Sequence, residues 1–384
     1  MLNGQEIDRD DRKAAPHSVH SEAVSLQRQP RLYESRFTAY KKKIAALVLL
    51  IIISLAYGAS GQDKPKLIGE IEFFGYSRTD LNKLRAVLPF HENDRFDLET
   101  FGEKVEQARE AVKQVTGQSP TDLMPVCCDD RGDWIVFIGL SGKATRYNPL
   151  PRGTTRLPDY TLKLYDRFIK VLFEGVQQGD FREDRSTGYA LSSYPPLRSV
   201  QLEMRAYAVG HYRLLRDVLE TSADERQRTV AAQLIGYARQ SKSQIAALAR
   251  AAHDANGGVR NNATRALIVL AESNPKLARE IPAEGFIEML LSGTWTDLNK
   301  SSGLLDSITK GRGAKVMAQL RRREVLDRLI EMARWRSHGD AAKYILGRVA
   351  GIDESRLGQL VRTGQAEVII NELQRNPTMK GRDR

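Results

Sequence analysis

A run of apolar residues at positions 44–57 constrains this chain more than any other feature. Three lysines at 41–43 lead directly into it, and Gly58-Ala-Ser-Gly61 ends it. As a helix, residues 44–59 would span about 24 Å, slightly less than a bilayer core of about 30 Å. Basic residues before an apolar run and small residues after it are typical of a translocation signal rather than of a buried helix. We therefore expect residues 44–60 to form a transmembrane helix or a signal sequence.

Two interpretations of this segment stay open. It is either a signal peptide cleaved after Gly58 or Gly61, which would give a secreted protein, or a retained signal anchor. Residues 1–43 are polar, read as disordered, and are much longer than the basic region that opens a usual signal peptide. This favours a single-pass protein of the bacterial inner membrane, with a cytoplasmic leader and a periplasmic, extracytoplasmic folded part. A start codon placed too early would return the preference to the signal peptide.

Residues 67–140 carry the pattern of a small α+β domain. Alternating apolar residues at 67–76 predict a half-buried strand. Thr79 or Asp80 can cap a first helix that Pro89 stops, and a second helix follows Asp97. Two more strands are expected at 123–128 and 134–140, joined by a turn at 129–133. The predicted order is β-α-α-β-β.

This domain resembles a POTRA domain, in which two helices lie on a small sheet. The resemblance rests on Ile68-Gly-Glu-Ile-Glu-Phe-Phe-Gly75, the two helices and Trp134-Ile-Val-Phe-Ile-Gly-Leu140. It implies a membrane-proximal domain that binds proteins, often by adding a partner strand to a sheet edge. It carries over no catalytic residue. A general α+β domain without this role is the alternative.

The chain has two cysteines, Cys127 and Cys128. This number is too small for a disulfide framework or a multi-cysteine zinc site. Because they are neighbours on a predicted strand, one side chain should face the core. Adjacent Cα atoms about 3.8 Å apart make a bond between them strained. We therefore expect one buried thiol and one exposed thiol.

Residues 141–159 are rich in Gly, Pro, Arg and Thr and are expected to be a linker. A helix at 160–178 then opens the second domain. A polar loop follows at 179–188, where Asp180, Glu183 and Asp184 lack the spacing of a calcium loop.

Short amphipathic helices fill the remainder of the second domain, residues 160–373, and a disordered tail is expected at 374–384. A register places Ala231, Ala263, Gly303 and Ala342 at offsets of roughly 32, 40 and 39 residues, close to the period of two-helix solenoid repeats. The segment resembles HEAT-type repeats, most clearly at Val259-Arg-Asn-Asn-Ala-Thr-Arg-Ala-Leu267. The resemblance implies a surface that binds macromolecules. A non-repetitive helical bundle is the alternative.

The net charge of +11 allows anionic partners, and basic residues concentrate at 312–348. The candidate binding surface comprises Arg321, Arg322, Arg323, Arg334, Trp335 and Arg336, with Trp335 adding a stacking face if it is exposed. An ordinary solvated helix face, with arginine stems covering apolar neighbours, is the favoured alternative. Export argues against nucleic acid as a partner.

The six histidines form no ligand-spaced cluster, and we find no motif of a hydrolase, metalloprotease or phosphate loop. We expect no catalytic residue, metal or cofactor. The fold class is a multidomain chain: one N-terminal transmembrane helix, a small α+β domain and an all-α solenoid. Its expected function is that of a non-enzymatic scaffold that binds protein partners in the cell envelope. A soluble intracellular HEAT scaffold and a solenoid enzyme of the lyase type are the alternatives.

Overall fold

The computed structural model describes residues 66–76, 79–140, 146–178, 180, 182–311 and 313–375. The expected leader and membrane segment, and most of the expected tail, lie outside these ranges. Among the described residues, no helix is both long enough and apolar enough to cross a membrane.

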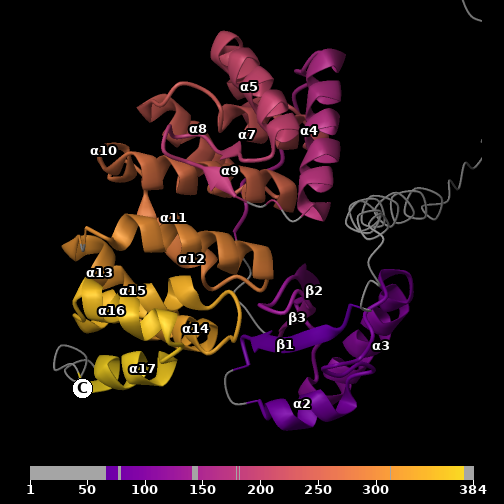
Figure 1. Ribbon diagram of the computed structural model, residues 1–384, viewed down its shortest axis with the longest axis vertical. Coiled ribbons are helices and arrows are strands. Elements are labelled where there is room, and N and C mark those ends of the chain that lie inside the picture. Colours follow the sequence, from indigo (N-terminus) through magenta and orange to yellow (C-terminus); the bar gives the residue numbers. More distant parts are fainter. Residues whose placement is uncertain are drawn as a thin grey trace, which may run out of the picture. The chain divides into compact units, whose positions relative to one another are not determined.

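The described part of the chain opens with a small domain that combines a mixed sheet with two helices (Figure 1). Its elements are β1 (Ile68–Phe74), α2 (Leu81–Val87), α3 (Leu98–Thr116), β2 (Asp122–Cys127) and β3 (Trp134–Gly139). The strand order is β1-β3-β2, in which β3 is parallel to β1 and antiparallel to β2. The order β-α-α-β-β expected from the sequence is confirmed. Asp80 caps α2, because its carboxylate accepts from the backbone N–H of Asn82 and Lys83.

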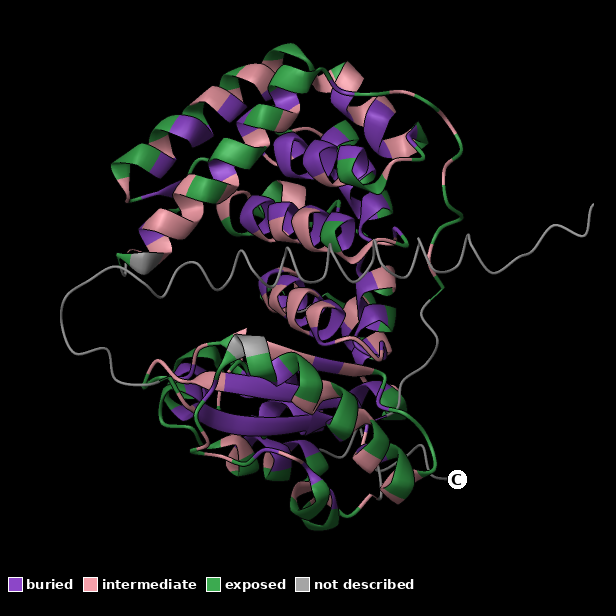
Figure 2. Cartoon of the chain, turned by 90° about the vertical axis from the view of Figure 1, so that its right-hand side faces the viewer, coloured by how far each residue is buried: buried purple, intermediate pink, exposed green. Residues whose placement is uncertain are grey.

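Strand β1 is buried along its whole length rather than on one face (Figure 2). The expectation of a half-buried strand was therefore wrong. The alternation in the sequence comes from Glu70 and Glu72, which are themselves buried. They have polar partners in the helical part of the chain, as described below.

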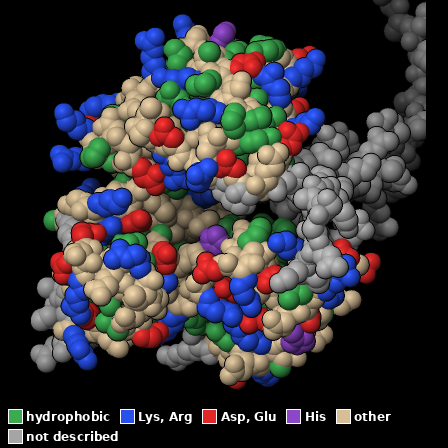
Figure 3. All heavy atoms as spheres, viewed as in Figure 1, with side chains coloured by type: hydrophobic (Ala, Val, Ile, Leu, Met, Phe, Trp, Pro, Cys, Tyr) green, Lys and Arg blue, Asp and Glu red, His purple; other side chains and the backbone are tan. Residues whose placement is uncertain are grey.

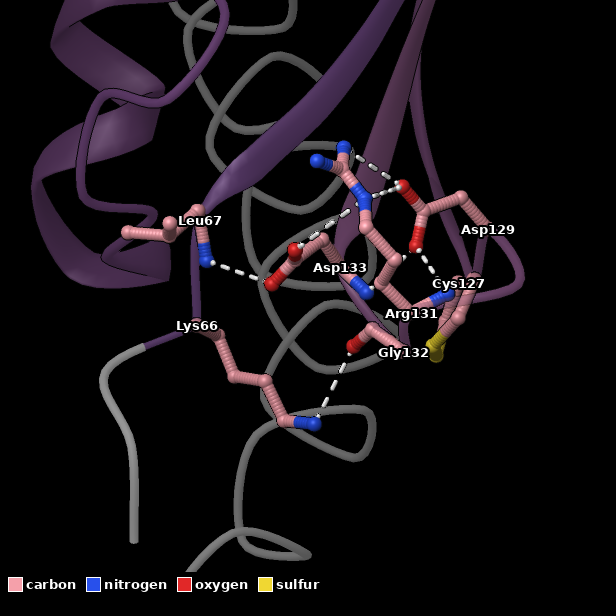
Figure 4. The surroundings of a disulfide bond; sticks show 8 residues. Lys66, Leu67, Cys127, Asp129, Arg131, Gly132 and Asp133 are labelled. Carbon is pink, nitrogen blue, oxygen red and sulfur yellow. Dashed lines mark hydrogen bonds and ion pairs between the residues drawn. A yellow bond between two sulfur atoms is a disulfide. The ribbon is translucent and has the colours of Figure 1, made fainter. Parts of the chain in front are cut away.

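The turn between β2 and β3 is held by the carboxylate of Asp129 (Figure 4). This carboxylate accepts from the backbone N–H groups of Arg131 and Asp133, each at 2.9 Å, and from the Arg131 guanidinium. Burial acts to raise the pKa of Asp129, but these hydrogen bonds outweigh it and the pKa is lowered. A side chain at Gly69 of β1 would overlap the Asp129 carboxylate. A larger residue at this position would therefore force the turn or the strand to shift.

Cys127 and Cys128 are joined in a disulfide, at the end of β2 beside this turn. Cys127 is exposed and Cys128 is half-buried. The expectation of one buried, unpaired thiol was therefore wrong. The strand ends at Cys127, so neither side chain enters the core.

The rest of the described chain is mainly helical, with one short hairpin and an irregular segment at residues 146–158. The hairpin, β4 (Glu183–Asp184) with β5 (Leu191–Ser192), begins inside the segment that was expected to be a plain polar loop. The helices are α4 (Asp159–Gln177), α5 (Pro195–Gly210), α6 (Tyr212–Thr221), α7 (Glu225–Ile235), α8 (Lys242–Ala251), α9 (Gly257–Ser273), α10 (Pro275–Ala278), α11 (Ala283–Met289), α12 (Trp295–Thr309), α13 (Ala314–Leu320), α14 (Arg323–Ala333), α15 (Asp340–Ala350), α16 (Glu354–Arg362) and α17 (Ala366–Arg375).

The sequence register of the helical part agrees with its packing. The helices that it aligns, α7, α9, α12 and α15, contact one another in that order (Figure 1). Arg228 of α7 and Arg260 of α9 are buried and make the same bonds. The Nη1 atom of each donates to the carbonyls five and six residues earlier, and each Nε donates at 2.8 Å to an aspartate near the start of the next aligned helix, Asp254 or Asp297. Buried Arg–Asp pairs therefore link α7 to α9 and α9 to α12.

The described part of the expected linker, residues 146–158, is bound along the helical array. Four of its residues make hydrogen bonds to the helical part. The bonds join Tyr147 to Asp297, Asn148 to Arg250 and His253, Gly153 to Thr221 and Ala223, and Leu157 to Gln227. The Arg260 guanidinium lies over the Tyr147 ring, 4.2 Å from its centroid. These residues act as a strap, because polar partners on α6, α7, α8 and α12 fix their path.

Candidate functional site

The sheet domain packs against the helical array along a contact that we call the seam. It is formed by β1, β2, β3 and residue 92 on one side, and by residues 331–338 and the start of α12 on the other. Trp335, in the turn between α14 and α15, is its centre and is only 2% exposed. Its indole Nε1 donates to the Phe73 carbonyl at 3.0 Å, and its ring packs edge-on against Phe74 and Phe137.

Polar contacts surround this aromatic centre. The backbone N–H of Gly75 donates to Glu331 at 2.8 Å, and the Ser337 hydroxyl donates to Glu70 at 3.0 Å. On β2, the other edge strand of the sheet, the Asp122 carboxylate accepts from the backbone N–H of Trp295 at 2.8 Å. Buried polar groups of the strands therefore find their partners in the helical array.

Arg336 is the main charged residue of the seam. Its guanidinium pairs with Glu72 of β1 at 3.2 Å and with Glu92 in the loop after α2. Glu92 also pairs with Arg85 of α2 at 3.4 Å and accepts from the backbone N–H of Ile71. One arginine of the array is thus held by two carboxylates of the sheet domain.

The two carboxylates differ in their electrostatics. Burial raises the pKa of Glu72, and the hydrogen bonds from Arg336 offset this only in part. Burial acts in the same direction on Glu92, but bonds from Arg336 and Ile71 outweigh it, so the pKa of Glu92 is lowered. The hydrogen bond to Glu92 in turn raises the pKa of Arg336. At neutral pH both groups are therefore charged, and Glu92 and Arg336 form an ion pair.

A pocket of about 500 Å³ opens along this charged edge of the seam. Its lining residues are Ile71, Glu72, Arg85, His91, Glu92, Arg334 and Arg336. All of them except Ile71 carry ionisable side chains. Within the described ranges, no group of His, Cys, Asp and Glu side chains is arranged to hold a metal ion. The pocket therefore presents the charged ends of these side chains together with their apolar stems.

The candidate surface expected from the sequence divides into two places. Arg334 and Arg336 line the pocket, and Trp335 lies beneath them. Arg321, Arg322 and Arg323 lie at the connection between α13 and α14 and do not line it. There Arg322 pairs with Glu288 and Glu324, and Arg323 with Asp327. Because Trp335 is buried, it offers no exposed stacking face; anion binding by the arginines stays a prediction.

The sequence did not point to the sheet-domain residues of the pocket, Glu72, Arg85, His91 and Glu92. Their partners lie far along the chain: Arg336 is 264 residues after Glu72 and 244 after Glu92. The one local signal was a pair of glutamates, Glu70 and Glu72, within an otherwise apolar strand. Alternation made them look solvent-facing, whereas an acidic residue on a buried strand also indicates a basic partner.

Comparison with protein-family models and with curated proteins finds no match for this chain.

Proposed function

We propose that this chain is a non-enzymatic interaction scaffold of the bacterial cell envelope, which binds a protein partner at the seam between a POTRA-like sheet domain and a HEAT-like helical array. The observation that carries the proposal is the seam pocket, which is lined from both parts and in which six of the seven lining residues have ionisable side chains. Enzyme pockets for small molecules are mostly apolar, with few polar groups. Ionisable side chains around an open pocket instead fit the polar, solvent-accessible rim of a protein–protein interface.

The pocket, rather than a sheet edge, is the favoured contact. The outer edge of β1 is already used, because Ile71 and Gly75 donate to Glu92 and Glu331 while the Phe73 carbonyl accepts from Trp335. The outer edge of β2 carries Pro125, which cannot donate a ladder hydrogen bond. Strand addition is therefore disfavoured at both edges.

A partner would meet three arginines and two glutamates in the pocket. Arg334 is exposed and pairs with Glu367 of α17 at 2.7 Å, while the His91 side chain is 61% exposed at the rim. Ion pairs between such exposed groups are weak. A partner carrying acidic side chains can therefore replace Glu367 at little cost.

Site-specific photocrosslinking tests the proposal. A photoreactive amino acid is placed at His91 in the full-length chain, and at Glu110 on the exposed face of α3 as the control. We expect a discrete protein adduct from position 91 in isolated membranes and none from position 110. No adduct at 91, or the same adducts from both positions, would overturn partner binding at the pocket.

The proposed location has its own test. A reporter enzyme that is active only outside the cytoplasm is fused to residue 384 of the full-length chain. We expect activity, because the lysines at 41–43 would keep the leader inside. An inactive but stable fusion would contradict export and favour the intracellular scaffold.

A further inference from the structure

A chemically reactive group lies away from the seam pocket, at the end of β2. There Cys127 and Cys128 form a disulfide, which Figure 4 shows beside the turn at residues 129–133. The charged side chains of the sheet domain give no comparable feature on the face that Figure 3 presents, because Lys and Arg are interspersed with Asp and Glu there. Neither cysteine lines the seam pocket.

This disulfide is poorly placed to stabilise the fold. A disulfide stabilises a chain mainly by closing a loop, and the effect grows with the number of residues in that loop. Cys127 and Cys128 are adjacent, so their bond encloses no other residue. The structure around the bond has its own contacts, because Cys127 pairs with Trp134 in the ladder between β2 and β3, and the Asp129 carboxylate holds the turn. Opening the disulfide would therefore leave the strand and the turn in place.

The two cysteines differ in their access to solvent. Cys127 is exposed, whereas Cys128 is half-buried. Exchange begins when a thiolate attacks a sulfur that it can reach, and exposed disulfides are among the labile ones. Attack is therefore directed to the Sγ atom of Cys127, with the Sγ atom of Cys128 as the leaving group.

Trp134 forms a wall beside Cys127. The two residues lie directly opposite each other in the antiparallel pair, so their side chains share one face of the sheet. The Trp134 ring is half-buried and is held by stacking on Phe96, with a distance of 4.4 Å between the ring centroids. An incoming thiol would thus meet a fixed aromatic surface next to the sulfur that it attacks, and contacts between sulfur and aromatic rings are favourable.

We propose that the Cys127–Cys128 disulfide is an exchange site that accepts electrons from external thiols. In the first step a thiolate bonds to the Sγ atom of Cys127, the bond between the cysteines breaks, and its electron pair passes to the Sγ atom of Cys128, which takes up a proton. In the second step another thiolate attacks the external sulfur of this mixed disulfide, and Cys127 leaves as a thiolate that takes up a proton. The protein disulfide is thereby reduced to two thiols, and two external thiols are oxidised to one disulfide.

The exchange site needs no partner at the seam. It shares with the proposed function only the oxidising environment outside the cytoplasm, in which a disulfide persists. Experiments on the purified protein therefore test the exchange site independently of the proposed scaffold.

Reduction of the oxidised full-length protein by reduced glutathione tests access to the bond. Free thiols are blocked with a maleimide, and the intact mass then shows both the blocked thiols and any bound glutathione. We expect the disulfide of the folded protein to be reduced at a rate within about tenfold of its rate in denaturant, because solvent reaches it. A disulfide that resists glutathione in the folded protein, but not in denaturant, would overturn the proposal.

Two single variants form a matched pair that identifies the attacked sulfur. Cys128→Ser keeps the exposed cysteine, and Cys127→Ser keeps the half-buried one. With oxidised glutathione, Cys128→Ser should form a mixed disulfide about tenfold or more faster than Cys127→Ser does, because access limits the attack. Equal rates, or a faster reaction of Cys127→Ser, would contradict the role of Cys127.

Replacement of both cysteines by serine separates exchange from a structural role. The thermal unfolding midpoint of this double variant should equal that of the oxidised parent, because the bond encloses no other residue. A clearly lower midpoint would assign the disulfide a structural role and would overturn the proposal.

The source of the external thiol is identified in cells that produce the full-length Cys128→Ser variant. An adduct that a reductant removes is expected in either of two forms. A larger band on a non-reducing gel indicates a protein thiol, and a small increase in intact mass indicates a small-molecule thiol. A variant that carries no adduct in cells would show that the site does not meet thiols there, against the proposal.

Discussion

The indole of Trp335 donates a hydrogen bond to the carbonyl of Phe73, a residue 262 positions earlier in the chain. This bond lies in a buried aromatic cluster and occupies an outer-edge carbonyl of β1. It joins the first strand of the sheet domain to a late turn of the helical array. The seam therefore joins the two parts by hydrogen bonds to buried backbone groups as well as by side-chain packing.

Removing the indole should separate these two contributions. Trp335→Ala loses both the ring and the bond and should lower the free energy of unfolding by about 3–5 kcal/mol. Trp335→Phe keeps most of the ring but leaves the Phe73 carbonyl without this donor, so a smaller loss of about 1–3 kcal/mol is expected. Denaturant unfolding of the three proteins measures both values. Equal stability of Trp335→Phe and the parent would show that the bond contributes nothing.

The buried Arg228–Asp254 pair should matter far more than an exposed pair of the same type. The Arg228 side chain is 0% exposed and the Asp254 side chain is 8% exposed. Removing the charge of one partner therefore leaves the other charge buried without a counter-charge. Asp254→Asn should therefore destabilise the protein by about 3–5 kcal/mol. The control is Asp166→Asn, which breaks the exposed pair with Arg226 and should change stability by less than about 1 kcal/mol. Similar effects of both substitutions in denaturant unfolding would contradict a structural role for the buried pair.

Gly69 offers a test of the turn at Asp129. A Cβ there would overlap the Asp129 carboxylate and lie 2.9 Å from the Cβ of Asp133. Gly69→Ala should therefore cost about 1–3 kcal/mol of stability, measured by thermal unfolding. Gly102→Ala is the control, because the added methyl group on α3 would have no atom within 4 Å apart from the neighbouring residues and backbone of its own helix. It should be neutral or stabilising by up to about 1 kcal/mol, and a destabilising Gly102→Ala would show that the steric argument is too simple.

The sequence predicted the local elements and the stacking of the helices well. Hydrophobic periodicity and the cap at Asp80 are local signals, so the order β-α-α-β-β and the register of α7, α9, α12 and α15 could be read from them. The Val-Arg-x-x-Ala pattern even contained Arg260, although the pattern alone did not name Asp297 as its partner.

Relations between distant segments could not be read in this way. The burial of Trp335 depends on β1 and β3, which no local pattern links to the turn after α14. The sequence predicted a linker at the strap because Gly and Pro indicate an irregular backbone. Composition does not show that this backbone hydrogen-bonds to distant helices. The pocket needs Glu72, Glu92 and Arg336 together, and their pairing is a property of the folded chain alone.

Glu92 predicts a pH dependence of the seam. Its pKa is lowered from 4.5 in the folded protein, so the ionised form is favoured by folding. The stability that Glu92 contributes should therefore be present above about pH 4.5 and be lost as the pH falls through the lower folded value. Glu92→Gln should thus be less stable than the parent at pH 7, and the difference should shrink toward pH 3. Glu106→Gln, which breaks an exposed pair on α3, serves as the control with little effect at either pH. A difference between Glu92→Gln and the parent that stays constant from pH 7 to pH 3 would show that the Glu92 charge does not stabilise the seam.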